Sequence, residues 1–482
     1  WGRQIYGNSY INGVAISESA APYVCGFNNV QINIGGSNLY NAIGGVDGFV
    51  AKMDPAGNVA WYSPIGYPGS TCKVHDITRA PDNTFLIAGE ATDTLAFGSD
   101  TSTVFGNPGS FFVARLDTGG QYQWIFRHGG SRYGGSYQVD HLVRADTANN
   151  CYAYVAWDST LFFGQDTFRY NHPTGNSAII KFDPSGNPLW AFPVFRSSHY
   201  QNAMAVDDDG NTYAAFAVYD SIFIGGTTIV NTGDPDFTIA KISPNGTLLW
   251  TRTIASAGLT LPGSMAIDSY GNLLLTAYYS GWGTLDGAPI VTIVGTSGFI
   301  AKFSPSGTLL WQEFADQPSA PGFPNDDFPI AAGRNGDFYV ASGLTVQGCN
   351  ACTVAIDQHV FPVCCSSSPL LCVRYDSSGT AKWVARSQRD VGLAPNAFDI
   401  AVDTFGNIYS TGSFHGFAVL GGDSLTRWTF GYSGYVAKVN AQYSAVSGVV
   451  FDDWNFNGTF DSTDVLVENA VIATSPGGDV FD

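Results

Sequence analysis

An eight-residue phrase recurs along this chain of 482 residues. It reads DPSGNPLW at 183–190, SPNGTLLW at 243–250 and SPSGTLLW at 304–311. Weaker copies end on the same residue type, so that a Trp returns after about 60 to 72 residues, a spacing typical of repeat architectures. The residues concerned are Trp1, Trp61, Trp124, Trp190, Trp250, Trp311 and Trp383. A repeat of this length without helical periodicity predicts a stacked or radial β architecture.

Each repeat predicts four consecutive strands. MAIDSYGN at 265–272 and LLLTAYY at 273–279 are two apolar strands joined by an Asp and Gly-Asn turn, which is typical of a tight hairpin. A third strand carries a Lys or Arg, and a Pro-Ser-Gly turn leads into a fourth strand that holds the Trp. Four strands cannot bury both faces of their own sheet, so the repeats must stack on one another. Seven of them in a ring form a seven-bladed β-propeller, an all-β fold.

The count of seven rests on a lead-in segment of the type FVAK before each phrase. Its copies lie at 49–54, 112–117, 178–183, 238–243, 299–304, 371–376 and 435–440. The seventh repeat supplies three strands within residues 398–440 but has no fourth strand with a Trp. WGRQIY at 1–6 is a fourth strand without partners before it. We therefore expect a propeller over residues 1–446, closed by pairing the N-terminal strand with the seventh blade.

Composition and charge narrow the class of protein. The chain has 57 Gly and 14% aromatic but only 13% charged residues, which is typical of a turn-rich all-β protein. Its net charge of −19 would repel a phosphate backbone, so nucleic acid is not an expected partner. No apolar run approaches the roughly 20 residues of a membrane helix. The chain starts at Trp1 without a signal segment, from which we expect a mature or trimmed soluble chain without membrane insertion.

Enzyme motifs are incomplete in the sequence. SPNGTLLW approaches the sialidase Asp-box, but Asn245 stands where that motif needs Asp, and a turn explains the segment. GWGTLDG at 281–287 is followed by the strand-like IVTIV, whereas a dinucleotide loop requires a helix there. No Gly-x-Ser-x-Gly elbow occurs, and the seven His do not share a repeat position. We therefore expect a protein that is not an enzyme.

Two sets of repeated or exposed side chains have alternative interpretations. A basic residue in every blade suggests either a cationic ring or, as the repetition favours, a structural role in which the charge pairs with turn acids. The residues are Lys52, Arg115, Lys181, Lys241, Lys302, Arg374 and Lys438. Trp157, Trp282 and Trp428 suggest stacking on sugar rings, with packing between blades as the alternative.

The repeat resembles the seven-bladed propeller repeats of the SBBP type, which occur in secreted bacterial proteins. The similarity lies in IAVD-x-x-GN-x-Y, then Phe or Tyr before Val-Ala-Lys, then D-P-S-G-x-x-x-W. It covers residues 1–446 and weakens in blade two, where PDNTFLIAG stands at 81–89, and in blade six, which holds an insertion. The resemblance implies an extracellular location. It implies no single activity, because propellers host many functions.

Blade six contains a cluster of cysteines. The resemblance to secreted proteins favours disulfides that staple a long loop, and a zinc knuckle with four thiolates is the alternative. The candidate residues are Cys349, Cys352, Cys364 and Cys365. Asp-x-x-Gly-x-x-x-Trp also resembles the tryptophan-docking motif of quinoprotein dehydrogenases, some of which carry a vicinal disulfide. Those propellers usually have eight blades, and that family's calcium ligands are not recognisable in this sequence.

The remaining cysteines fall on predicted core strands. Cys25 lies in the second strand of blade one, and Cys72 enters the first strand of blade two. Because these strands belong to neighbouring blades, the two residues are a second candidate disulfide. Cys151 and Cys372 are then expected to be free buried thiols.

The pattern changes at residue 447. Residues 447–482 resemble the opening of the calcium-binding B-type repeats of bacterial adhesins, which implies an incomplete immunoglobulin-like β-sandwich module that continues beyond this segment. The loop DWNFNGTFDSTD at 453–464 places oxygen ligands at alternate positions around Gly458, and oxygen ligands of this kind suit calcium. A solvated acidic loop is the alternative. The predicted ligands are Asp453, Asn455, Asn457, the carbonyl of Thr459, Asp461 and Asp464.

Asp-Ser and Asp-Thr pairs recur along the chain. They resemble the O-glycosylation sequon of bacteria that use type IX secretion, although turn formation explains the same pairs. The candidate acceptors are Thr94, Thr147, Ser159, Ser221, Ser424 and Ser462.

Taken with the two resemblances, these features predict a non-catalytic extracellular binding or structural protein at the cell surface, adhesin-like or filament-forming, with calcium and a protein or glycan ligand. The alternative is a secreted enzyme with its site at the propeller mouth, quinoprotein-like or glycan-acting. An enzyme should bring ionisable side chains together in the central funnel. A scaffold should show only those that the repeat requires.

Overall fold

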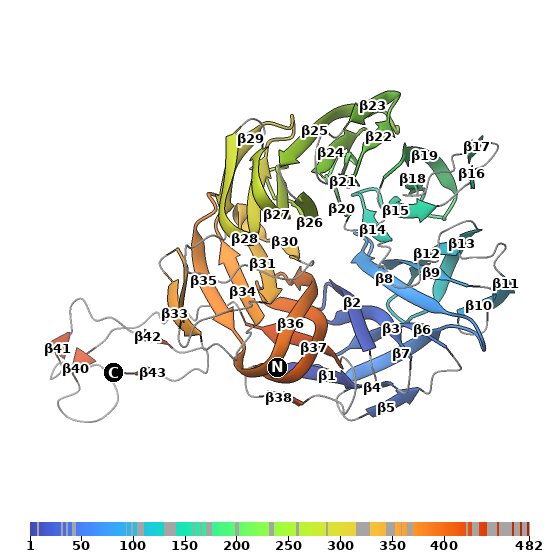
Figure 1. The fold of residues 1–482 in the computed structure, drawn as a ribbon. Coiled ribbons are helices and arrows are strands. Elements are labelled where there is room, and N and C mark those ends of the chain that lie inside the picture. The colour runs from blue at the N-terminus through green and yellow to red at the C-terminus, as the bar shows by residue number, and fades with distance from the viewer. Residues whose placement is uncertain are drawn as a thin grey trace. The chain divides into compact units, whose positions relative to one another are not determined.

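A computed structural model gives the fold of the chain (Figure 1). The chain divides into two compact units, Trp1–Val439 and Asn440–Asp482. The structure describes residues 1–6, 9–29, 32–34, 37–40, 45–92, 94–97, 100–103, 110–129, 141–157, 160–163, 166–169, 176–197, 202–230, 236–256, 260–285, 288–314, 328–343, 352–357, 359–363, 370–420, 423–426, 433–440, 451–452, 465–466, 473–474 and 480–481.

Seven four-stranded antiparallel blades form the first unit, which confirms the predicted propeller (Figure 1). Blade 1 contains β2 (Ser9–Ile16), β3 (Pro22–Asn28), β6 (Asp47–Met53) and β7 (Val59–Ile65). Blade 2 contains β8 (Cys72–Arg79), β9 (Phe85–Ala91), β12 (Ser110–Leu116) and β13 (Tyr122–Gly129). Blade 3 contains β14 (Leu142–Ala145), β15 (Cys151–Trp157), β18 (Asn176–Phe182) and β19 (Pro188–Phe195). Blade 4 contains β20 (Ala203–Val206), β21 (Thr212–Val218), β24 (Asp236–Ile242) and β25 (Leu248–Ser256).

The remaining blades repeat this order. Blade 5 contains β26 (Thr260–Ile267), β27 (Leu273–Leu285), β28 (Ala288–Phe303) and β29 (Leu309–Phe314). Blade 6 contains β30 (Ile330–Ala332), β31 (Phe338–Gly343), β34 (Leu370–Tyr375) and β35 (Ala381–Arg386), with the short 3₁₀ turn η1 (Arg334–Gly336) between its first two strands. Blade 7 contains β36 (Gln388–Val402), β37 (Ile408–Leu420) and β39 (Ser433–Val439), and takes its fourth strand from the other end of the chain.

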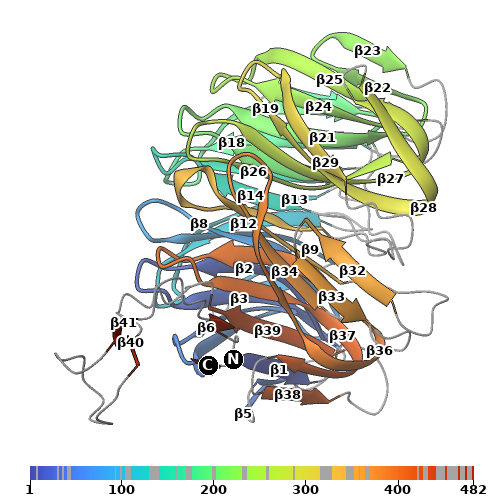
Figure 2. The ribbon, with the colours of Figure 1, turned by 90° about the vertical axis from the view of Figure 1, so that its left-hand side faces the viewer.

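The fourth strand of blade 7 is β1 (Gly2–Tyr6), as the sequence predicted. It pairs antiparallel with β39, in a register that places Gly2 opposite Ala437 and Ile5 opposite Gly434. Figure 2 shows β1 beside β39 at the closure of the ring. Residues more than 400 positions apart are thereby held in one sheet, by roughly one backbone hydrogen bond per residue.

A hairpin inserted between the second and third strands was not predicted from the sequence. Examples are β4 (Ile32–Ile34) with β5 (Ser37–Tyr40), β10 (Thr94–Phe97) with β11 (Asp100–Thr103), and β22 (Ser221–Ile224) with β23 (Thr227–Val230). Each of these hairpins pairs with the fourth strand of the preceding blade: β4 with β1, β10 with β7, and β22 with β19. The hairpins therefore cover part of the outer strand edges, which would otherwise be open to pairing with other chains.

Other insertions take related forms. In blade 5 the outer end of β27 itself pairs with β25. Two further hairpins are paired only within themselves: β16 (Thr160–Phe163) with β17 (Asp166–Arg169), and β32 (Cys352–Ile356) with β33 (His359–Val363). In blade 7, β38 (Asp423–Thr426) pairs with the outer end of β37.

The Trp of each phrase joins its blade to the next one. In six blades its indole Nε1 donates a hydrogen bond to a carbonyl in the third-to-fourth strand turn of the following blade, at 2.8 to 3.2 Å. The glycine of that turn lies against the ring. At Gly246, for example, φ is +78° and an added Cβ would lie 3.0 Å from Cδ2 of Trp190. The two halves of the recurring phrase are thus the two sides of one contact between blades.

Apolar side chains fill the spaces between blades. Tyr213 and Phe237 of blade 4 pack with Leu275 and Phe299 of blade 5 in one buried cluster, and equivalent clusters join other neighbouring pairs. Each blade thus buries both sheet faces against its neighbours, which is the stacking that the repeat predicted.

Within the unit Asn440–Asp482, two short strand pairs are described. They are β40 (Phe451–Asp452) with β41 (Val465–Leu466), and β42 (Ala473–Thr474) with β43 (Val480–Phe481). The predicted immunoglobulin-like sandwich is not confirmed by these pairs. Across the described residues of the whole chain, no helix has the length and apolar character needed to cross a membrane.

Candidate functional site

The repeated basic residues have a structural role in the blades where their partners are described. Lys302 forms a 2.7 Å ion pair with Asp268 of its own blade, and its Nζ donates to the Ser377 carbonyl of the next blade. Equivalent ion pairs join Arg115 to Asp82, Lys181 to Asp146, Lys241 to Asp207, and Arg374 to Asp337. These charges hold turns and blades together, which confirms the structural interpretation for the five residues.

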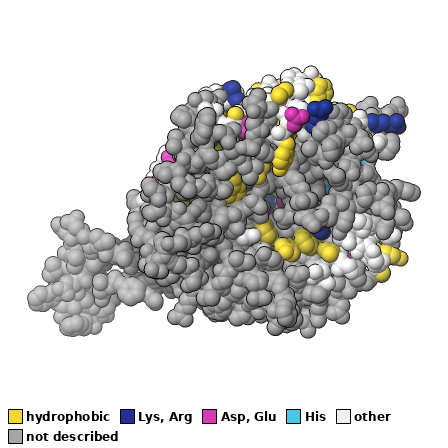
Figure 3. Space-filling model, viewed as in Figure 1, with side chains coloured by type: hydrophobic (Ala, Val, Ile, Leu, Met, Phe, Trp, Pro, Cys, Tyr) yellow, Lys and Arg dark blue, Asp and Glu magenta, His cyan; other side chains and the backbone are white. Residues whose placement is uncertain are grey.

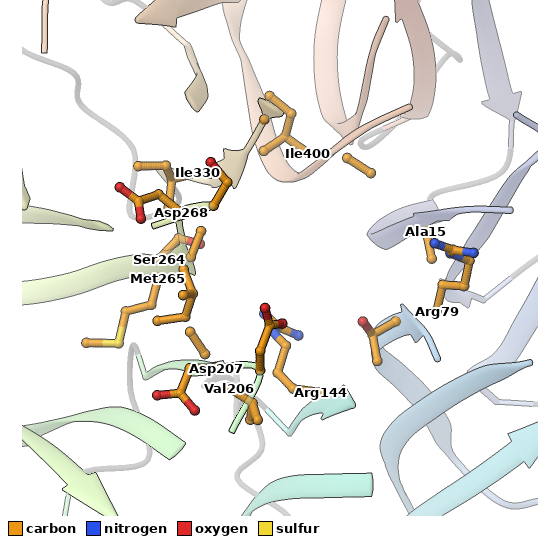
Figure 4. Close-up of a pocket in the computed structure, with 18 of the residues that line it drawn as sticks. Ala15, Arg79, Arg144, Val206, Asp207, Ser264, Met265, Asp268, Ile330 and Ile400 are labelled. Carbon is orange, nitrogen blue, oxygen red and sulfur yellow. The ribbon is translucent and has the colours of Figure 1, made fainter. Parts of the chain in front are cut away.

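The first strand of every blade lines a central cavity of about 730 Å³ (Figure 4). In Figure 3 the centre of the ring is hollowed, and apolar side chains border it. The first strands of blades 4, 5 and 7 end in the related sequences MAVD, MAID and IAVD. The alanine in these sequences lies two residues before the turn that joins the first and second strands, which we call the inner turn. Its small side chain leaves the centre of the ring open. The same position holds Ala15, Thr78, Arg144, Ala205, Ala266, Ala331 and Ala401 in blades 1 to 7.

Four charged side chains of the first strands at this cavity depart from the repeat; Arg79 pairs with Glu18, and the other three, Asp76, Arg144 and Asp399, lie near one another. Arg144 extends from β14, where the local sequence is VRAD, and Figure 4 shows it reaching into the cavity. Its Nη1 donates to Oδ2 of Asp76 at 2.6 Å and to the Val143 carbonyl at 2.6 Å. Asp399 of β36 lines the same cavity. These residues were not predicted from the sequence, although each inner strand concerned carries a charge where the other blades mostly have alanine or another small residue.

The two aspartates occupy equivalent positions and join blades in the same way. Oδ2 of Asp76 accepts the backbone N–H of Val143 in the next blade, and Oδ2 of Asp399 accepts that of Val14 across the ring closure. In both residues Oδ1 accepts the N–H of the following residue. A β-bulge directly precedes each aspartate and turns its side chain toward the neighbouring blade. Each carboxylate therefore uses both oxygens to hold backbone groups.

The environment of Asp399 favours its neutral form. Burial raises the pKa of its carboxyl, the charge of Asp76 raises it further, and together they outweigh the backbone hydrogen bonds and Arg144, so that the pKa lies at about 7. A carboxyl that titrates near neutrality is often found at functional sites. Here it also carries a structural hydrogen bond between blades.

A smaller cavity of about 100 Å³ continues from the first and shares Asp76, Arg144 and Asp399 with it. Lys73 and His75 line this second cavity, and Lys73 forms a 3.1 Å ion pair with Glu90. His75 Nε2 lies 3.8 Å from Glu90, which is too long for a hydrogen bond but close enough for electrostatic attraction. Burial opposes ionisation of Glu90, but His75 and then Lys73 outweigh it and lower its pKa to about 2.

The four cysteines whose side chains are described are free thiols, and they include both residues of the predicted Cys25–Cys72 pair. The strand register explains why this pair does not form. An added Cβ at Gly13 would meet both Cys25 Sγ and Ile77, so Cys25 lies level with Ile77. Cys72 begins the same strand, roughly 16 Å away at about 3.3 Å per residue. The prediction that Cys151 and Cys372 are free and buried is confirmed.

Several predicted site residues lie outside the described residues. They are the calcium-binding loop at 453–464 and Cys349, Cys364 and Cys365, while Cys352 is described only by its backbone in β32. Within the part of the chain that the structure describes, no group of three or more His, Cys, Asp or Glu is arranged to hold a metal ion.

The predicted glycosylation acceptors differ in exposure. Thr147 is exposed, and its hydroxyl donates to the Asp208 carbonyl. Thr94 is half-buried, whereas Ser221 is buried and accepts a hydrogen bond from Arg196. Ser424 is described only by its backbone in β38, and Ser159 and Ser462 lie outside the described residues.

Sugar stacking by Trp157 is excluded by its burial. The side chain is fully buried and packs edge-on against Phe195, because it fills the space beside β19 within its own blade. The Trp282 side chain and Trp428 are not among the described parts of the chain.

Comparisons with known proteins find distant similarities and no family to which the chain can be assigned. No protein-family profile matches the chain. An uncharacterized WD repeat-containing protein of Acanthamoeba polyphaga mimivirus is 22% identical over 334 residues. The match covers 55% of this chain and 24% of that protein, so the chain spans about a quarter of the relative's length.

Similar solved structures are distant. YCF48 bound to D1 peptide has a TM-score of 0.42 at 11% identity and covers 92% of this chain and 96% of its own. Sqt1 from Chaetomium thermophilum has a TM-score of 0.39 at 11% identity, with 90% and 97% covered. A gluconolactonase from Xanthomonas campestris has a TM-score of 0.31 at 14% identity, with 70% and 84% covered.

Proposed function

We propose that this protein is a non-catalytic binding or structural propeller that acts outside the cell. In this proposal it is adhesin-like or filament-forming and binds a protein or glycan ligand at the cell surface. The resemblance of its repeats to the SBBP type, and of residues 447–482 to B-type adhesin repeats, supports the location. A calcium ion bound at 453–464 would rigidify that segment, because calcium prefers the oxygen ligands present there.

One observation carries the non-catalytic part of the proposal. The charged side chains of the repeat form ion pairs within a blade, and Lys181, Lys241 and Lys302 also donate to carbonyls of the next blade. The two carboxylates that depart from the repeat, Asp76 and Asp399, also have a structural role, because each of their oxygens holds a backbone N–H group. The ring therefore resembles a rigid platform more than a reaction centre.

The connections between blades also support a binding function. The connection from the fourth strand of one blade to the first strand of the next ranges from the single residue 387 to residues 315–329. The turns at the other ends of the strands repeat one hydrogen-bonding pattern, from Asp207 N–H to the Asn211 carbonyl in blade 4 and likewise in other blades. Variable connections on a constant scaffold are the usual place for ligand recognition.

An enzyme at the propeller mouth remains the second candidate because Asp76, Arg144 and Asp399 are charges that the repeat does not require. The two candidates differ in what changing these residues does. In a binding platform, a variant with Asp76→Asn and Asp399→Asn that still folds keeps its ligand, whereas an enzyme would lose turnover.

The proposal is tested by locating the protein and then measuring adhesion. Antibodies should detect the chain in the culture medium or on intact cells, with a cytoplasmic protein as the control for lysis. Beads coated with the full chain should adhere to the producing cells, and excess soluble chain should compete. Detection of the protein only inside cells, or adhesion that soluble chain does not reduce, would contradict the proposal.

A further inference from the structure

Arg144 stands at a position where the propeller has no need of a charge. Its equivalents in the other six blades are five alanines and one threonine. Four of these alanines line the cavity of about 730 Å³ and leave it open, and this volume is within the range of small-molecule sites. Because the other blades fold with a small residue at this position, the fold of the blade does not require the arginine.

The arginine is held in place on one side and open on the other. Its Nη1 is fixed by Oδ2 of Asp76 and the carbonyl of Val143. Within the described part of the chain, neither Nε nor Nη2 makes a hydrogen bond, and 27% of the side chain is exposed. The Nε and Nη2 edge of a guanidinium matches the two oxygens of a carboxylate, and an ion pair behind it reduces the entropy lost on binding.

Groups that accept hydrogen bonds surround this edge. Asp399 and Ser264 line both cavities together with Arg144. Each oxygen of Asp399 already accepts one backbone N–H, and a carboxylate oxygen retains a second lone pair for a ligand donor. Asp208 and Asp209 are exposed where the larger cavity opens between the inner turns. This acidic surrounding disfavours multiply charged anions such as phosphate.

We propose that the central cavity binds a small monocarboxylate that carries hydroxyl or amino donors, with its carboxylate on Arg144 and its donors on Asp399 and Ser264. This site is separate from any ligand of the variable connections. It needs no catalytic step, and its existence does not depend on where the protein acts.

Titration of the full chain with four defined probes tests the site. Sodium gluconate supplies a carboxylate with hydroxyls, glycine a carboxylate with an ammonium group, acetate a bare carboxylate, and sodium phosphate a multiply charged anion. Calorimetry at low salt should show saturable binding of gluconate, glycine or both, at least about tenfold tighter than acetate or phosphate. Binding of gluconate alone identifies a hydroxycarboxylate site, and binding of glycine alone identifies an amino-carboxylate site.

Variants separate recognition from folding. Arg144→Gln keeps most of the side-chain volume. It should lower the affinity for the probe that binds by at least about tenfold, because the charged bidentate contact is lost. Arg79→Gln is the matched control, since it removes one positive charge from the same cavity at a residue that pairs with Glu18, and it should weaken binding by much less than Arg144→Gln. Melting temperatures of both variants establish that they fold. Absence of saturable binding to either gluconate or glycine, phosphate binding as tight as theirs, or equal affinity in Arg144→Gln would overturn the proposal.

Discussion

The contact between a Trp and the glycine turn of the next blade can be tested by adding one methyl group. Gly246 has φ +78°, and its Cβ would lie 3.0 Å from Trp190 Cδ2. Gly271 has φ +79° in a turn with the same backbone hydrogen bonds, and its Cβ would meet only Pro305 Cγ at 4.0 Å. Gly271→Ala is therefore a matched control for Gly246→Ala, because the backbone strain is the same and the contact with the Trp is absent.

The two substitutions should differ in how much they lower the free energy of unfolding. Alanine in the left-handed region costs about 1–2 kcal/mol at either site. At Gly246 the ring and turn must also separate toward an ordinary contact distance of about 3.5–4.0 Å. That movement strains the 2.8 Å hydrogen bond from Trp190 Nε1 to the Pro244 carbonyl, which contributes about 1 kcal/mol. We expect a loss of about 1–2 kcal/mol for Gly271→Ala and about 2–4 kcal/mol for Gly246→Ala.

Urea denaturation followed by circular dichroism, with Trp fluorescence as a second probe, measures both losses from the midpoint at constant slope. A Trp190→Phe background completes a double-mutant cycle, since it removes the indole N–H while keeping a ring. Gly246→Ala should cost less in that background than in the native chain. Equal destabilisation by Gly246→Ala and Gly271→Ala would refute the docking argument.

Three further predictions concern the ring closure, the carboxyl of Asp399 and the loop at 453–464. Deleting residues 1–6 should expose the edge of β39 and lower the melting temperature, and an unchanged melt would show that closure by β1 does not stabilise the ring. The folded pKa of Asp399, about 7, lies above the unfolded value, so its contribution to stability is complete below about pH 4 and is lost as pH rises to 7, by at most about 1.4 kcal/mol per pH unit. Melting curves of Asp399→Asn should lack this decline between pH 5 and 7, and a decline equal to that of the native chain would contradict the assignment. Calcium should raise the temperature at which residues 440–482 of the full chain unfold and Asp453→Ala should abolish the rise, whereas unfolding insensitive to chelation would exclude the site.

Much of the candidate site was beyond prediction because it is assembled from distant parts of the chain. Asp399 and Asp76 lie in blades 7 and 2, and they come close only because the ring closes between them. The sequence indicated each residue's strand but not which strands share a cavity. The Cys25–Cys72 prediction was wrong for a related reason. Neighbouring blades were correctly identified, but the register between their strands depends on packing that the repeat does not encode.

The pairing of the inserted hairpins with the preceding blade was also beyond prediction from the sequence. β10 joins β7 of the preceding blade through a pair between Phe97 and Ile65, and this pair depends on how the two blades pack. The segments that form the hairpins share a Gly turn signal after a short apolar stretch, as in INIGGSN at 32–38, LAFGSDT at 95–101 and IFIGGTT at 222–228, but this pattern does not tell which strand edge the hairpin joins.

The sequence alone was sufficient for the number of blades, their strand order, the ring closure and the structural role of five of the repeated basic residues. All of these follow from a motif whose hydrogen bonds are local or repeat between adjacent copies, as from Trp190 to Pro244. Only the tertiary structure decided which departures from the motif meet, because the seven inner strands converge on one axis from points spread along the whole chain. Arg144 is ordinary in its own strand and becomes a candidate ligand-binding residue only in the cavity that the other six blades leave open.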